Sequence, residues 1–139
     1  MKKIRNLIII ALVSLICVQT VLCVSAQSTN ARVANVAGGT CGDDVTWVLS
    51  EDGTMTIEGT GPMATVGYWY NPVWNDYDSQ IKKVVIKKGV TTVQNKGFEG
   101  CANLTKVTLP STITSIESGA FNGCTSLTSI TIPKKVTNI

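Results

Sequence analysis

The stretch FNGCTSLTSITIP, residues 121–133, nearly restates the stretch FEGCANLTKVTLP, residues 98–110. Cys124 follows Cys101 by 23 residues, and further pairs keep the same step. A fixed period of this length, with apolar residues at constant phase, is typical of stacked repeats whose units cannot bury their hydrophobic faces alone. The period relates the following pairs: Leu104 and Leu127, Val107 and Ile130, Leu109 and Ile132, Pro110 and Pro133, Ile116 and Ile139.

Three repeats are visible, beginning at Ile81, Leu104 and Leu127, and the third is cut short at Ile139. The first repeat is the most divergent, but it keeps apolar residues at the shared phases. We therefore predict a mainly β fold in which residues 81–139 form a β-solenoid of short strands and turns.

The faces of each repeat follow from the alternation of side chains along a strand. In LTKVTLP, residues 104–110, we expect the apolar side chains to point inward and Lys106 and Thr108 to point outward. Ala120 and Phe121 then fill the return corner. The outward positions of the first strand of each repeat form the candidate ligand-facing surface: Lys83, Val85, Lys106, Thr108, Ser129 and Thr131.

The chain opens with MKKIRNLIIIALVSLICVQTVLCVSAQS, residues 1–28. Basic residues precede a long apolar run that ends in small residues, which predicts a secretory signal peptide over residues 1–26 with cleavage after Ala26. The alternative is an uncleaved anchor helix, because the apolar run from Leu7 to Val24 is almost long enough to span a bilayer. After cleavage we expect no membrane span and a secreted or bacterial cell-surface location.

The positive charge of the whole chain comes from its first residues. Twelve basic and nine acidic residues give a net charge of +3, and three of the basic residues precede residue 27. The remaining chain has no net charge, but its charges are unevenly distributed: acidic residues are concentrated before residue 81 and lysines after it. The positive charge of the repeats could steer an acidic partner to them. The alternative is that these lysines only keep the repeat surface soluble. Nucleic acid is a poor partner for an exported, neutral chain.

The segment before the repeats divides into two parts. Residues 27–40 are rich in Ala, Val, Asn and Gly and are predicted to be a flexible leader. Residues 41–80 are predicted to cap the first repeat. Within them, VTWVLSEDGTMTIEG, residues 45–59, alternates apolar and polar positions around Asp52-Gly53, which predicts a β-hairpin. The rest of the cap is rich in aromatic residues: Tyr68, Trp69, Tyr70, Trp74 and Tyr77.

The residues give little support to catalysis or metal binding. The sequence has no histidine, so the usual base of a catalytic triad is missing. The paired carboxylates, Asp43 with Asp44 and Asp76 with Asp78, lie in turns where Asp favours the backbone geometry. Three widely spaced cysteines remain after residue 26, and they do not form a zinc ligand set. We predict no cofactor and no metal. Cys101 and Cys124 are interpreted as small buried thiols, with a disulfide between stacked repeats as the alternative.

Three stretches together closely resemble the BspA-like leucine-rich-repeat surface proteins of bacteria. They are GTCGDDVTWVLSEDGTMTIEGTGPM, residues 39–63; WNDYDSQIKKVVIKKGVTTV, residues 74–93; and CANLTKVTLPSTITSIESGAFNG, residues 101–123. The resemblance implies a curved leucine-rich-repeat solenoid on a bacterial surface, whose members bind host matrix proteins, other cells or receptors. The chain departs from the pattern at Ile86 and Lys87, where Leu-Pro is usual.

The sequence therefore predicts an exported, non-enzymatic interaction module. The expected partner is a host extracellular-matrix or cell-surface protein, with a polysaccharide as a further candidate. The open third repeat could also promote self-association, because an uncovered edge is a template for pairing. The alternative is that these residues are a structural spacer from a larger secreted protein, whose missing C-terminal domain could be catalytic.

Overall fold

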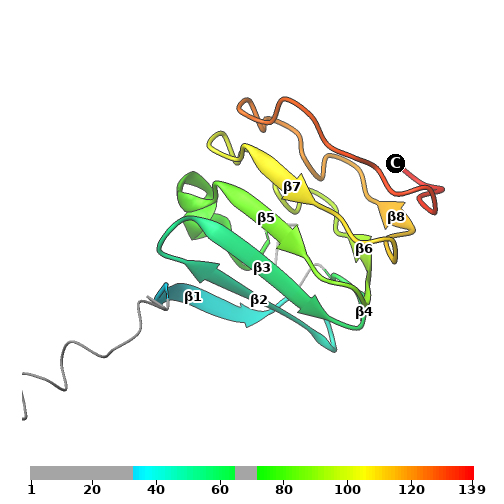
Figure 1. The fold of residues 1–139 in the computed structure, drawn as a ribbon, viewed down its shortest axis with the longest axis horizontal. Coiled ribbons are helices and arrows are strands. Elements are labelled where there is room, and N and C mark those ends of the chain that lie inside the picture. Colours follow the sequence, from blue (N-terminus) through cyan, green and yellow to red (C-terminus); the bar gives the residue numbers. More distant parts are fainter. Residues whose placement is uncertain (1–32, 65–71) are drawn as a thin grey trace, which may run out of the picture. The chain divides into compact units, whose positions relative to one another are not determined.

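The computed structural model describes residues 33–64 and 72–139 (Figure 1). The predicted signal peptide, and Tyr68, Trp69 and Tyr70 of the aromatic segment, lie outside these residues. Val33–Ile139 form one compact unit with a shared hydrophobic core. The described elements are mainly β-strands, as predicted.

Five strands form one mixed sheet, in which neighbours lie side by side in the order β1-β2-β3-β5-β7 (Figure 1). Their bounds are β1 Asn35–Thr40, β2 Val45–Ser50, β3 Thr54–Gly59, β5 Lys83–Ile86 and β7 Lys106–Thr108. The predicted hairpin is present as β2 and β3, which pair antiparallel around the Asp52-Gly53 turn. Asp52 stabilises this turn by accepting the Thr54 N–H at 2.9 Å. From β3 onward the pairing is parallel, so the hairpin continues directly into the repeats.

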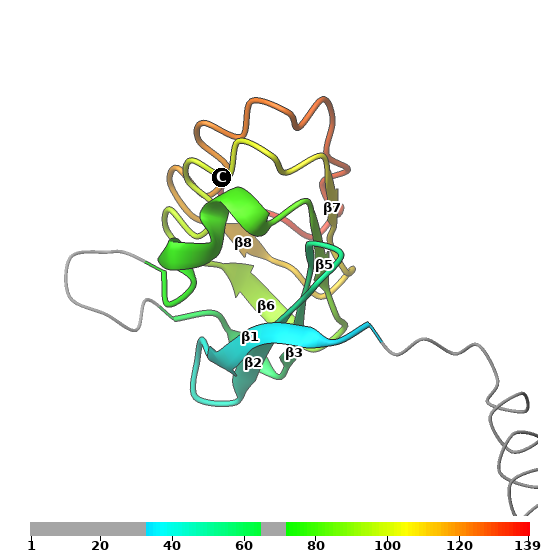
Figure 2. The same cartoon turned by 90° about the vertical axis from the view of Figure 1, so that its left-hand side faces the viewer.

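Three shorter strands form a second sheet, in the order β4-β6-β8. They are β4 Gly61–Pro62, β6 Val90–Val93 and β8 Ser115–Ile116, and they also pair in parallel. Figure 2 shows β6 and β8 on a different side of the stack from β5 and β7. Each of the first two repeats therefore contributes one strand to each sheet. A 3-10 helix over Asn75–Gln80 leads into the first repeat.

Main-chain hydrogen bonds connect the repeats at the 23-residue spacing. The Thr105 N–H donates to the Lys82 carbonyl at 2.9 Å, and the Thr114 N–H donates to the Thr91 carbonyl at 2.8 Å. Thr105 Oγ1 adds a second bond to the Lys82 carbonyl at 3.0 Å. The 23-residue period of the sequence is therefore the number of residues that separates the donor and the acceptor of these hydrogen bonds.

One prediction was wrong: residues 35–40 of the expected flexible leader form strand β1. The strand pairs antiparallel with β2 from Asn35 to Thr40, with an irregularity near Ala37. Its glycines allow this close pairing, because a Cβ on Gly38 would lie 2.9 Å from the Trp47 carbonyl oxygen and one on Gly39 would lie 3.3 Å from Trp47 Nε1. These small residues resemble a linker in the sequence, but here they are required because the two strands approach each other closely.

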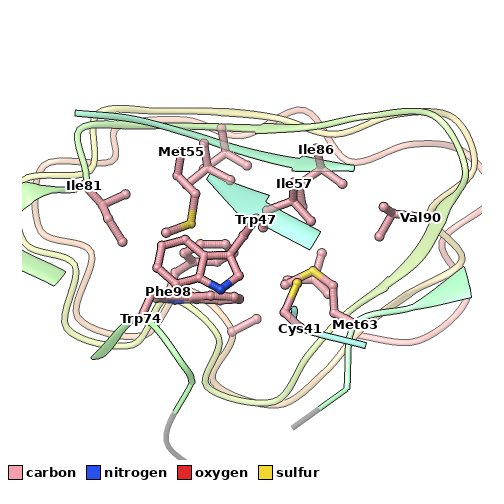
Figure 3. Packing of buried hydrophobic residues seen from close by; sticks show 14 of the residues in the cluster. Cys41, Trp47, Met55, Ile57, Met63, Trp74, Ile81, Ile86, Val90 and Phe98 are labelled. Carbon is pink, nitrogen blue, oxygen red and sulfur yellow. The ribbon is translucent and has the colours of Figure 1, made fainter. Parts of the chain in front are cut away.

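The core is built around a row of aromatic rings (Figure 3). Trp47 meets Trp74 edge-on at 5.6 Å, Trp74 stacks on Phe98 at 5.5 Å, and Phe98 stacks on Phe121 at 5.5 Å. Trp47 comes from β2, and Trp74 precedes the 3-10 helix, so the cap supplies rings to the same row that the repeats continue. The Trp74 Nε1–H donates to the Gly97 carbonyl at 2.7 Å, which satisfies its buried polar atom.

The corner that ends the second repeat, and the third repeat after it, differ from the prediction. Phe121, expected to fill a closed corner, is only partly buried, as are Leu127 and Ile130, and Ile132 is 39% exposed. The register would place residues 129–131 beside β7, yet they form no strand. The second half of the repeat is held more firmly, because the Thr137 N–H donates to the Thr114 carbonyl at 3.0 Å. Packing from only one side leaves these apolar residues incompletely covered.

Candidate interaction surface

The outer face of the five-stranded sheet carries four of the six predicted site residues. Along β5, Val84 and Ile86 are buried, whereas Lys83 is exposed and Val85 is half-buried. Along β7, Val107 is buried and its neighbours Lys106 and Thr108 are exposed. Strand alternation therefore sorts these side chains as predicted.

Parallel pairing aligns these residues in two columns. Lys83 lies opposite Lys106, and Val85 lies opposite Thr108. Ser129 and Thr131 are exposed, but their segment is not part of the sheet. Thr131 nevertheless lies beside Lys106 and Thr108, because the three line one hollow. The structure thus brings five of the six residues together and does not place Ser129 in a column.

The columns continue into the cap, which the sequence reading missed. Thr54 of β3 pairs with Lys83, and Thr56 pairs with Val85. Both threonines are partly buried on the same face. The 23-residue period could not have found them, since the hairpin is joined to the first repeat by a segment of different length. The alternation of buried and partly buried residues along β3 could have shown that these threonines share a face. It does not show that β3 pairs in parallel with β5.

The lysines on this face differ in their surroundings. Asp52 lies near Lys83, and the pKa of Asp52 is lowered, first by its hydrogen bonds from Thr54 and to a smaller extent by the Lys83 charge. Among the described residues the ion pair found is that of Lys96 and Glu99, at 3.2 Å, in the return corner. Lys83 and Lys106 are direct neighbours of like charge, an arrangement that is unfavourable between paired strands. A negatively charged partner would relieve this repulsion.

A hollow of about 570 Å³ lies between β7 and the third repeat. Its lining combines lysine, hydroxyl and apolar side chains and contains no acidic residue: Lys106, Val107, Thr108, Leu109, Ser111, Thr131, Pro133, Lys134 and Lys135. Such a lining can receive an anionic group at its lysines and apolar groups between them.

Asp78, Cys101 and Cys124 occupy the same phase of successive repeats. The Cys101 thiol donates to Asp78 Oδ1 at 3.8 Å, and the Cys124 thiol donates to the Phe98 carbonyl at 3.1 Å. Both cysteines are free. The pKa of Cys101 is raised, first by burial and then by the nearby Asp78 charge. These thiols therefore stay protonated near neutral pH and are poor nucleophiles.

Cys41 is also free and buried beside Met63 in the core (Figure 3). Burial raises its pKa to about 12. No group of three or more Cys, Asp or Glu side chains suited to a metal ion occurs within residues 33–64 and 72–139. Over the same residues, the structure has no helix with the length and apolarity needed to span a membrane.

Asp78 gives a testable pH dependence. Burial, and to a smaller extent the Asp76 charge, raise its pKa from 3.8 to about 6. Between these two values the folded chain binds more protons than the unfolded chain, so this group makes stability fall as pH rises from about 4 to about 6. Asp78→Asn keeps the acceptor for Cys101 and removes the titration. We expect the variant to gain melting temperature relative to wild type as pH rises through this window. A difference independent of pH would contradict the assignment.

Comparison with known proteins now identifies the repeats. The family described as the BspA type Leucine rich repeat region (6 copies) matches residues 76–139. These residues form a leucine-rich-repeat region of the BspA type.

The chain is also similar to solved structures of leucine-rich-repeat proteins. A leucine-rich repeat protein from Eubacterium ventriosum superposes with a TM-score of 0.67 at 35% identity, covering 76% of this chain and 28% of that protein. A leucine-rich repeat protein from T. pallidum gives a TM-score of 0.43 at 20% identity, covering 65% of this chain and 48% of that one. The chain thus spans less than half of either protein. Comparison with curated proteins gave no match.

Proposed function

We propose that this chain is an exported, non-enzymatic leucine-rich-repeat protein that mediates protein–protein interaction, with adhesion to host matrix proteins or other cells as its role. Its repeats form a solenoid, and the outer face of the five-stranded sheet is the binding surface. The proposal rests chiefly on one observation: the parallel register aligns Lys83 with Lys106 on an exposed sheet face.

Two further features support this proposal. Repeat proteins bind through extended surfaces built from equivalent positions of successive units, and this face presents such columns from β3 to β7. The leucine-rich-repeat region favours a binding module over an enzyme. Export is supported by the leader in the sequence, residues 1–26.

The experiment measures binding of residues 27–139 to immobilised fibronectin and fibrinogen. This chain retains the whole compact unit from Val33 to Ile139. We expect saturable binding that the Lys83→Ala/Lys106→Ala variant weakens, because the substitutions remove the exposed charges while leaving the buried side of the sheet intact. Lys87→Ala/Lys88→Ala is the matched control, since it removes two exposed lysines elsewhere.

A folded chain that binds neither protein would contradict adhesion to these matrix proteins. It would favour the alternative function, a structural spacer within a larger secreted protein. Equal weakening by both lysine variants would show that overall charge, rather than the sheet face, governs binding.

A further inference from the structure

We propose that the hollow between β7 and the third repeat binds a linear acidic polysaccharide, whose sulfate or carboxylate groups contact the lysines of the hollow. This inference deepens the proposed function and rests on it, because the polysaccharides of a host matrix or cell surface would meet the same sheet face as its proteins. Three features of the structure support it: the charge of the hollow, the closure of its β7 side, and the mixed chemistry of its lining.

The charge of the hollow is entirely positive. Lys106, Lys134 and Lys135 line it, and no carboxylate does. All three lysines are exposed, and none of them forms an ion pair with an acidic residue that the structure describes. Lys83 extends this charge along the stack, since it lies opposite Lys106 on the neighbouring strand. Such a concentration of like charge attracts anions, and a polymer with an anionic group on successive units would meet Lys106 and Lys83 in turn.

The side of the hollow along β7 is closed to an added strand. Residues 131–135 of the third repeat flank the outer side of β7 and line the hollow together with it (Figure 1). A peptide therefore cannot bind by extending the sheet, which is the usual way in which a strand edge recognises an extended chain. Recognition in the hollow depends on side chains alone, and the main-chain hydrogen bonds that would favour a peptide over other anions are not available.

The lining also offers groups that suit a sugar ring. The exposed side chains of Thr108, Ser111 and Thr131 carry hydroxyl groups, each of which can donate and accept a hydrogen bond. Leu109 and Pro133 add partly buried apolar surface. A sugar has hydroxyl groups at its rim and C–H groups on its faces, so it uses both kinds of surface. The carboxylate of an acidic protein side chain would use the lysines alone.

The experiment measures the binding of a fluorescent heparin oligosaccharide to residues 27–139 by anisotropy. We expect saturable binding that weakens as the salt concentration rises. Lys134→Gln/Lys135→Gln is expected to weaken it roughly tenfold, because two of the three lysine charges of the hollow are lost. Both lysines lie in an exposed turn that is closed by main-chain atoms, the Val136 N–H donating to the Pro133 carbonyl at 3.0 Å, so the variant keeps the fold.

Two further variants separate position and chemistry from overall charge. Lys87→Gln/Lys88→Gln is the matched control: it removes two exposed lysines that do not line the hollow, and we expect the affinity to stay nearly unchanged. Ser111→Ala/Thr131→Val keeps the charge and removes two hydroxyl groups. We expect it to weaken the binding of heparin, and to leave unchanged the weaker binding of polyglutamate, which presents carboxylates without hydroxyl groups. Dextran, an uncharged polysaccharide, is expected not to bind.

Four outcomes would overturn the inference: no heparin binding by the folded chain, equal effects of the two lysine variants, binding of dextran as tight as that of heparin, or binding of polyglutamate as tight as that of heparin. The last would assign the hollow to an acidic polypeptide. The matrix-protein assay distinguishes this failure from failure of the proposed function. Fibronectin or fibrinogen binding by a chain that does not bind heparin would refute the polysaccharide site alone. Heparin binding without binding to either matrix protein would refute adhesion to these proteins alone.

Discussion

Replacing Phe98 with Ala is expected to lower the free energy of unfolding by about 3–5 kcal/mol, the loss typical of a buried aromatic side chain. Phe98 is fully buried, and its ring is stacked between Trp74 and Phe121, with both centroid distances at 5.5 Å. Its removal would open a cavity between the cap and the second repeat. Urea unfolding followed by tryptophan fluorescence measures the loss.

Phe121→Ala is the matched control. Phe121 stacks on Phe98 but is only partly buried, since its other side has no covering repeat within the described residues. We expect it to cost roughly 1–2 kcal/mol, in proportion to the smaller apolar surface removed from water. Equal losses for the two variants would show that the corner of the second repeat is covered as fully as that of the first, contrary to the structure.

Gly89→Ala is expected to lower the free energy of unfolding by about 3 kcal/mol or more, from combined backbone strain and overpacking. Gly89 has a φ of +117°, and a Cβ there would collide with the Gly59 carbonyl oxygen. At this point the hairpin and the first repeat are held together by the Gly61 N–H, which donates to the Gly89 carbonyl at 3.1 Å. A side chain at Gly89 would therefore separate the cap from the repeats.

Gly61→Ala separates the two causes of that loss. Gly61 also has a positive φ, +102°, but a Cβ there would meet no atom within 4 Å. We expect it to cost roughly 1–2 kcal/mol from backbone strain alone. Thermal and urea unfolding of both variants provide the comparison. If Gly61→Ala is as damaging as Gly89→Ala, close approach of the backbones at Gly59 is not the cause.

The candidate interaction surface and the hollow beside it were predictable only in part. The outward positions of Lys83, Lys106 and Thr108 follow from alternation along short strands and were predicted. The involvement of Lys134 and Lys135 was not, because they follow Pro133 in a turn and no strand phase points to them. Only the packing of the third repeat beside β7 places them around a common hollow with Lys106 and Thr108.

The sequence by itself determined the features that depend on residues close together or on a constant period. These are the hairpin around Asp52-Gly53, the 23-residue register and the buried positions of the first two repeats. Turn chemistry and strand alternation are local, and equivalent residues of adjacent repeats meet because the period repeats. Pairing such as that of Thr114 with Thr91 is implicit in the register.

Tertiary structure alone decided how the non-repeating parts join this stack. It turned Asn35–Thr40 into a strand, because β2 offered an edge and Trp47 left room only for small residues. It placed Trp74 in the aromatic row beside Phe98, and it left residues 129–131 outside the sheet. These outcomes depend on contacts between segments that are distant in the sequence. Such contacts are set by burial and long-range strand pairing, which the 23-residue period does not encode.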